Sequence, residues 1–317
     1  GLTASPALAQ GDEEVDDEGG TRSLREQLDD ATAAYQDAKA ALDESEKREL
    51  RLNKELEALQ DELDELIEDI QIIGANAYQT GRVGAFAALL DSGSPSRFVE
   101  RVATVDMIAM RENDALARLR ELTDSVKEQR DLIAAEIELQ EDEVAKLEDA
   151  VKKAEQALFA VGGGSTGSFV AYESPLAKPA PRNADGTWPA ESCSVNDPTT
   201  SGCITPRMLH AYEEARIFGF TRYTSCHRGG SFGEHPLGRA CDFSAQPNGF
   251  GGVATGGDKE YGDRLASFFV TNADRLGVQY VIWYKQIWMP GTGWRTYSGA
   301  CGDPACDHTN HVHLSVR

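Results

Sequence analysis

The stretch Ser231-Phe-Gly-Glu-His-Pro-Leu-Gly-Arg-Ala-Cys-Asp242, read with His311-Val-His313 near the C-terminus, decides how the second half of this chain is organised. Its pattern is H-x-x-G-x-A-x-D, in which the histidine is His235 and the aspartate is Asp242. Two imidazoles and one carboxylate form a ligand set that Zn²⁺ takes in catalytic sites, where a fourth position is left for water. The sequence therefore predicts a zinc site built from these two segments.

The residues around these side chains fit a sheet. Gly238 and Ala240 are small, which suits a tight turn running into a strand where bulky side chains would block a metal. Because side chains alternate along a strand, we expect His311 and His313 on one face and Val312 in the core. One histidine of the pair can then bind the metal while the other faces the same cavity as a proton carrier.

The histidine–aspartate spacing followed by H-x-H resembles the superfamily of D-alanyl-D-alanine peptidases, lysostaphin-type endopeptidases and hedgehog-fold domains. The form H-x-x-G-x-A-x-D is similar to the D-Ala-D-Ala carboxypeptidase branch. The resemblance implies that His235, Asp242 and His313 bind the metal. It also implies that His311 is a catalytic histidine.

One position departs from the pattern of that branch. Carboxypeptidases of this kind usually place a glutamate three residues before the last histidine, and this chain has Asn310 there. The general base is therefore open between His311 and Glu234. A structural role is the alternative for any single histidine, but all six histidines lie between His210 and His313, which favours a shared site.

The acidic charge is concentrated in the first half. Residues 1–160 contain 39 acidic and 18 basic side chains and account for −21 of the net charge of −22. Such a surface argues against nucleic acid as a partner and against adhesion to anionic membranes.

All six cysteines lie in the second half of the chain. An even number confined to one domain indicates disulfides and an oxidising compartment. The spacings contain no CxxC pair, which argues against a zinc–thiolate site. Six cysteines allow fifteen pairings, of which nearest-neighbour pairing gives Cys193–Cys203, Cys226–Cys241 and Cys301–Cys306.

The first residues resemble the end of an export signal. Ser5-Pro-Ala-Leu-Ala9-Gln10 has the A-x-A form of a cleavage site, so we interpret residues 1–9 as the remnant of a signal peptide. Residues 11–20 are acidic and poor in apolar side chains, and we expect residues 1–21 as a whole to lie outside any folded domain. No stretch reaches the roughly 18 apolar residues of a membrane span, and we expect a secreted protein of the cell wall.

Residues 22–160 have the pattern of a coiled-coil rod. Apolar residues recur in alternating steps of three and four between Leu28 and Ile73 and again between Leu116 and Leu158, mostly with charged residues between them. This pattern predicts coiled-coil helices. A dimeric coiled coil and an intrachain antiparallel hairpin both fit, and two runs of similar length around a non-heptad middle favour the hairpin.

The middle of the rod, about residues 74–110, predicts a small helical tip, with Pro95 near a helix start. The tip would cap the hairpin or dock a partner. The A-Y-Q-x-G segment that runs from Ala77 to Leu90, followed by S-P-x-x-F-x-x-R from Ser94 to Arg101, resembles coiled-coil regulatory domains of secreted peptidoglycan hydrolases controlled by the FtsE–FtsX division complex. The resemblance implies that the rod inhibits or positions an enzyme until a membrane partner engages it.

A Gly/Ser/Pro-rich stretch, residues 161–189, predicts a flexible and extended linker. Residues 190–317 follow as a disulfide-containing domain of the α+β class. Thr205 and Pro206 predict a helix start, with the helix ending near Phe218, and a second helix is expected over 258–276. Strands are predicted at 222–226, 240–244, 278–284, 286–289 and 311–316.

Several further side chains are candidates for binding substrate. Five aromatic residues between Trp283 and Tyr297 fit core packing, with one or two lining a groove. Arg207, Arg228 and Arg239 can hold a peptide carboxylate in bidentate fashion, and Arg228 is the first choice because it is near the predicted ligands in sequence. His308 is a candidate donor to an oxyanion.

The sequence predicts a secreted zinc metallopeptidase that hydrolyses stem peptides of bacterial peptidoglycan in cell division or wall remodelling. Zinc would polarise the scissile carbonyl and lower the pKa of its water, and His311 would carry the proton. An endopeptidase is favoured over a carboxypeptidase because a rod-delivered enzyme works on polymer. One rival is a non-catalytic wall-binding module whose coiled coil recruits or activates another hydrolase. A second is a structural dimer with the rod as a spacer.

Overall fold

The computed structural model describes residues 20–317 except 91–92, 161–162, 165–168, 170 and 298–300. The predicted signal remnant, the acidic segment up to residue 19 and part of the Gly/Ser stretch lie outside the described residues. The chain forms two compact units: one contains the chain up to Leu42 together with Asp142–Arg317, and the other contains Asp43–Glu141. We call residues 22–42 and 142–160 the helix base, because these helical segments belong to the same unit as the sheet.

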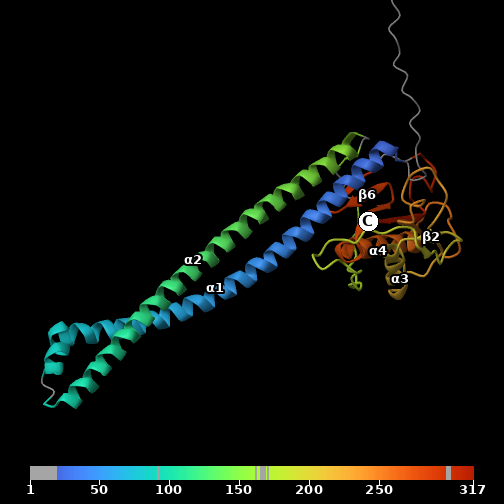
Figure 1. Cartoon of the computed structure of the whole chain (residues 1–317). Coiled ribbons are helices and arrows are strands. Elements are labelled where there is room, and N and C mark those ends of the chain that lie inside the picture. Colours follow the sequence, from blue (N-terminus) through green and yellow to red (C-terminus); the bar gives the residue numbers. More distant parts are fainter. Residues whose placement is uncertain (1–19, 91–92, 161–162, 165–168, 170, 298–300) are drawn as a thin grey trace, which may run out of the picture. The chain divides into compact units, whose positions relative to one another are not determined.

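Two long helices account for the predicted rod. Helix α1 spans Arg22–Leu90 and helix α2 spans Pro95–Ala160, and they run in opposite directions (Figure 1). The predicted tip is helical but continuous with the two long helices. Helix α2 begins at Pro95 as predicted, and the Ser94 hydroxyl accepts a hydrogen bond from the Arg97 amide at 3.4 Å.

Contacts between the helices of the second unit show the intrachain hairpin. Arg48 binds Glu136 with an Nη2–Oε1 distance of 2.7 Å. Farther along α1, Gln129 donates to Glu55 at 2.9 Å. Residues later in α1 therefore pair with residues earlier in α2, as two antiparallel helices require. The predicted helical hairpin is confirmed.

A six-stranded antiparallel sheet forms the centre of the other unit, in the order β3-β4-β8-β5-β6-β7. Its strands are β3 Thr224–Ser225, β4 Ala240–Ser244, β5 Val278–Trp283, β6 Gln286–Met289, β7 Gly293–Thr296 and β8 His311–Val316. A separate two-stranded sheet pairs β1 Val195–Asn196 with β2 Cys203–Ile204. The helices of this region are α3 Pro206–Ile217, α4 Gly256–Thr271 and α5 Ala273–Leu276.

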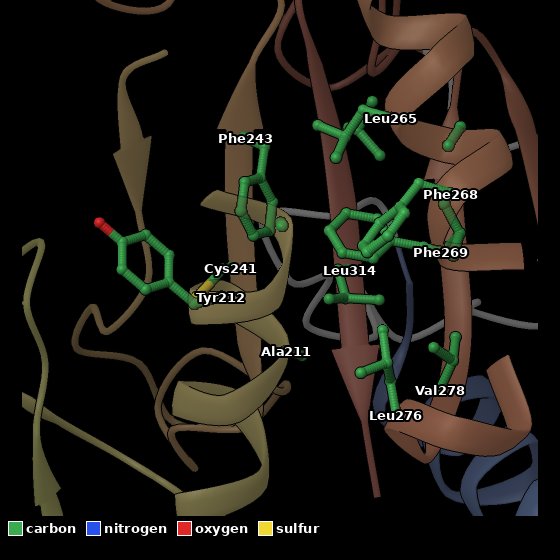
Figure 2. Close-up of a cluster of buried hydrophobic side chains, with 14 of the residues drawn as sticks. Ala211, Tyr212, Cys241, Phe243, Leu265, Phe268, Phe269, Leu276, Val278 and Leu314 are labelled. Atoms are coloured by element: carbon green, nitrogen blue, oxygen red, sulfur yellow. The ribbon is translucent and has the colours of Figure 1, made fainter. Parts of the chain in front are cut away.

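One face of the sheet packs against the helices α3 and α4. Phe268 and Phe269 of α4 lie against the strands that carry Phe243 and Leu314 (Figure 2). These strand residues alternate with Asp242 and His313, which therefore point to the other face. The mixed helix-and-sheet class predicted for this part of the chain is confirmed.

The opposite face of the sheet is partly covered by the helix base. Leu28 of α1 and Leu158 of α2 are buried in a cluster with Tyr280 and Ile282 of β5. Burying each leucine stabilises the fold by about 1.5–3 kcal/mol. The helix base is thus a layer of the sheet unit.

The end of the predicted linker is extended but docked. Residues 171–189 contain almost no regular structure, yet Ala177 and Trp188 are buried. Asn272, which interrupts the predicted helix over 258–276, accepts a hydrogen bond from the Ala177 amide at 2.7 Å and donates to the Pro175 carbonyl at 2.9 Å. This part of the segment is held against the sheet unit, so it is not a free joint.

The three disulfides match the nearest-neighbour pairing: Cys193–Cys203, Cys226–Cys241 and Cys301–Cys306. Gly238 lies beside the first of them with a φ of +70°. A Cβ at Gly238 would lie 2.6 Å from the Cys193 sulfur. The glycine is therefore required by backbone conformation and by packing on the disulfide, and the expectation that small residues keep space for a metal does not explain it.

Replacing Gly238 with alanine is expected to destabilise the sheet unit by about 2–5 kcal/mol, from left-handed backbone strain and overpacking. Gly293→Ala is the matched control, because Gly293 has the same φ of +70° and nothing within 4 Å of the added Cβ. Urea unfolding followed by tryptophan fluorescence reports on this unit, since all four tryptophans lie in residues 188–294. Equal losses in the two variants would contradict the packing argument.

Candidate metal centre

The pairing of β4 with β8 brings two of the predicted ligands together. Asp242 lies directly opposite His313 in the antiparallel register, and Ser244 lies opposite His311. Opposite residues of an antiparallel pair share a face. The two histidines and Asp242 therefore line one side of the sheet, as alternation along the strand predicts.

His235 reaches the same place from the loop before β4. The loop turns tightly, with the Gly238 amide donating to the His235 carbonyl at 3.0 Å. The Cys226–Cys241 disulfide ties the start of β4 to the segment before the loop. His235 is fully buried, so its position is set by surrounding protein.

Three ligand atoms converge at this point, all within 4.8 Å of one another. His313 Nδ1 lies 2.9 Å from Asp242 Oδ1, and His235 Nε2 lies 3.3 Å from the same oxygen. The two ring nitrogens are 3.3 Å apart. The structure thus brings together the three residues predicted to bind metal.

The outer atoms of these side chains have partners. His235 Nδ1 donates to the Cys226 carbonyl. Because a carbonyl only accepts, the neutral His235 ring has its lone pair on Nε2, facing inward. His313 Nε2 lies 2.8 Å from the Ser315 hydroxyl, and Arg228 Nη1 donates to Asp242 Oδ2 at 2.5 Å. Such outer hydrogen bonds orient ligands at metal sites.

His311 is oriented in the same way by Asn310. The Asn310 amide nitrogen donates to the Gly251 carbonyl at 2.7 Å, which turns its oxygen toward His311 Nδ1, also at 2.7 Å. His311 Nδ1 must therefore carry the proton, which leaves the lone pair on Nε2, 3.4 Å from Asp242 Oδ1. His311 lies outside the group of three converging ligand atoms.

Burial lowers the pKa of His311 to about 4, although Asp242 opposes the shift. The ring is therefore neutral near pH 7 and its Nε2 accepts a proton or binds a cation. For Asp242, burial raises the pKa, but the neighbouring histidines outweigh it and hold the pKa well below its usual range. The ionised carboxylate and the Nε2 atoms of His235 and His311 thus face the same point. A divalent cation fits this donor set, because it satisfies oxygen and imidazole nitrogen together.

His308 lies beside His311 and His313, and we refer to these three residues with His235 and Asp242 as the cluster. The predicted role of His308 as a donor to an oxyanion is not supported. Its ring centroid lies 4.8 Å from that of His311. Burial holds the pKa of His308 well below its usual value, and Nδ1 donates to the Cys306 carbonyl at 3.0 Å. The remaining ring nitrogen of the neutral side chain is an acceptor, whereas an oxyanion needs a donor.

The other predicted site residues differ in whether they contact the candidate ligands. Arg228 contacts Asp242, and the Arg228 side chain is 31% exposed. Glu234 is buried and bound by Arg239, with an Nε–Oε2 distance of 2.6 Å, so it does not face the cluster as a base. Arg207 is buried and donates to the Pro189 carbonyl at 2.8 Å. Its position gives no support to substrate binding.

Three residues of the site were missed or undervalued from sequence. Ser315 is two positions beyond His313 and so shares its face, a signal available in the H-x-H-x-S pattern. In the sequence Asn310 marks only the position of the absent glutamate, whereas in the structure it orients His311. Tyr280 stacks on His313 with ring centroids 5.5 Å apart and an interplanar angle of 14°, and it comes from a strand that carries no ligand.

Comparison with known protein families matches part of the sheet unit. A family model described as "VldE, C-terminal domain" matches residues 200–311. The matched segment contains His235, Asp242 and His311 and ends before His313. No curated protein and no solved structure matches the chain significantly.

Ser315→Ala is expected to weaken metal binding by roughly 10-fold, the lower end of the effect of removing a partner that orients a ligand. Ser244→Ala is the control. Ser244 lies on the same face of the sheet as Ser315, but its buried hydroxyl donates to the Gly249 carbonyl and not to a candidate ligand. Competition against a chromophoric chelator measures both affinities. Equal affinities for the two variants would contradict the orienting role of Ser315.

Proposed function

We propose that this protein is a secreted zinc-dependent peptidase of the bacterial cell wall, with its centre at His235, Asp242 and His313. The observation that carries the proposal is the convergence of these three ligand atoms, with an outer hydrogen bond on each side chain. Two imidazoles and a carboxylate are the set found in open, catalytic zinc sites. Bound there, zinc would act as a Lewis acid and lower the pKa of a coordinated water.

The neighbouring side chains supply the proton transfer and the binding of substrate. His311 Nε2 accepts a proton, since its Nδ1 is committed to Asn310. Asn310 thus fixes the tautomer that a base requires. Arg228 is partly exposed beside Asp242, and its guanidinium can bind a carbonyl or carboxylate oxygen of a peptide.

The substrate class comes from the resemblance of the ligand pattern to D-alanyl-D-alanine and lysostaphin-type peptidases. We therefore propose stem peptides of peptidoglycan, cut at cross-links. The disulfides indicate an extracellular or otherwise oxidising environment, which suits a secreted wall enzyme. Among the described residues, none of the helices combines the length and apolarity of a membrane crossing.

The hairpin would connect the enzyme to a membrane-embedded partner of the FtsE–FtsX type. Near the start of α2, apolar side chains are exposed without a covering layer among the described residues: Val99 is 68% exposed and Met107 is 60% exposed. Exposed apolar side chains of this kind favour a protein contact. The resemblance of residues 22–160 to regulatory coiled coils supports the same assignment.

A non-catalytic wall-binding module is the second candidate. The observation that favours it is the absence of a carboxylate base at Asn310, together with the ion pair that engages Glu234. A metal with His311 alone beside it could bind wall peptides without cutting them. Hydrolysis by the full chain distinguishes the two candidates.

The proposal is tested by measuring zinc content and release of fragments from purified peptidoglycan by the full chain. We expect about one zinc per chain, release that stops with a chelator and returns with zinc, and loss of both zinc and release in His313→Ala. His311→Ala should keep zinc and lose release by roughly 10²–10⁴-fold, as expected for a general base.

His210→Ala is the control, because His210 contacts the Lys178 carbonyl and lies outside the cluster. Zinc binding without any release by the wild type would favour the wall-binding module. Unchanged zinc content in His313→Ala would contradict the metal centre itself.

A further inference from the structure

An ion-pair network joins helix α1 to the loop that carries a metal ligand. Asp29 of α1 binds Arg239 with an Nη2–Oδ2 distance of 2.9 Å. Arg239 in turn binds both carboxylate oxygens of Glu234, at 2.8 and 2.6 Å. Glu234 immediately precedes His235. The network therefore runs from the helix base to the ligand loop.

The same side chain of α1 also reaches the strand beside the site. Gln279 of β5 donates to the second oxygen of Asp29. The next residue, Tyr280, stacks on the ring of His313, and the Arg25 guanidinium of α1 lies 5.2 Å from the Tyr280 ring centroid. Helix α1 is thus connected to two of the three candidate ligands. Ion pairs connect it to the residue before His235, and packed side chains connect it to His313.

We propose that Asp29 of helix α1 is a positioning residue for the metal centre, so that the helix base forms part of the support that holds His235 and His313 in place. The inference rests on the metal centre proposed above. It goes beyond that proposal by assigning the ligand support to a helix otherwise interpreted as a regulatory rod. The side chains of Asp29 and Arg239 are each 26% exposed, so the pair is only partly screened by solvent. Removing Asp29 would leave Glu234 as the remaining carboxylate partner of Arg239 and would free the ligand loop from helix α1.

The chain contains a matched ion pair in the same layer. Asp37 of α1 binds Arg317 with an Nη2–Oδ2 distance of 2.8 Å. This pair also joins the helix base to the sheet unit, through the residue after β8. Among the described residues, the other hydrogen-bond partners of Arg317 are Ala33, Arg207 and Gly277, and none of these belongs to the loop that carries His235. Loss of Asp37 therefore removes a comparable docking contact without disturbing the network around His235.

The test measures the dissociation constant of Zn²⁺, by chelator competition, for the full-length wild type and for Asp29→Ala, Asp37→Ala and His313→Ala. Circular dichroism of each apo protein checks that the helices are intact. We expect Asp29→Ala to bind zinc about 3–10-fold more weakly and Asp37→Ala to stay within about twofold, since removal of a partner that touches a ligand directly costs about 10–100-fold.

The outcomes separate the two proposals. If Asp29→Ala binds zinc as tightly as Asp37→Ala while His313→Ala has lost binding, the positioning role is wrong and the metal centre stands. Wild-type affinity in His313→Ala would contradict the metal centre and the inference with it. Should Asp29→Ala lose its helical spectrum, Asp29→Asn, which keeps the shape and removes the charge, is judged by the same comparison.

Discussion

The register between β4 and β8 is the constraint on which the site depends. It sets Asp242 opposite His313 and places His311 and Ser315 on the same face. A shift of β8 by one residue would turn His311, His313 and Ser315 to the face of Phe243, into the apolar layer under the helices, and would turn Leu314 out of that layer. The apolar alternation that builds the core therefore also assembles the polar cluster, and neither can move without the other.

The two faces of the sheet are covered by different elements and carry different side chains. One packs on α3 and α4 and forms the larger apolar core, where the buried Asp263 of α4 accepts a hydrogen bond from Trp283. The other carries the histidine cluster and, beside it, the apolar residues covered by the helix base. Because α1 begins and α2 ends on the face that holds the candidate metal ligands, the helix base and the candidate centre share one side of the sheet.

Local patterns predicted much of this arrangement. Strands β4, β6 and β8 begin and end where alternation and turn residues placed them, and the helical hairpin follows from its apolar repeat. Nearest-neighbour spacing predicted all three disulfides. The residue pattern predicted that these two segments meet, and the resemblance to zinc peptidases predicted which three residues, His235, Asp242 and His313, come together.

The remainder depends on contacts between residues far apart in the chain. Asn272 ends helix α4, and its side chain binds the extended segment near Ala177. This contact joins residues 95 positions apart, so the sequence pattern could not predict it. Arg207 was a candidate to hold a peptide carboxylate, but it is buried against Trp188 and donates to the Arg317 carbonyl. Glu234 was a reasonable base from its place next to His235, but Arg239 holds it away from that role.

X-ray absorption at the zinc edge of the zinc-loaded full chain tests the central claim most directly. The account predicts a first shell of imidazole nitrogen and oxygen at about 2.0–2.2 Å, with the multiple-scattering signature of two histidines and no sulfur. A sulfur shell near 2.3 Å, or a zinc surrounded by oxygen alone, would contradict a centre built from His235, Asp242 and His313.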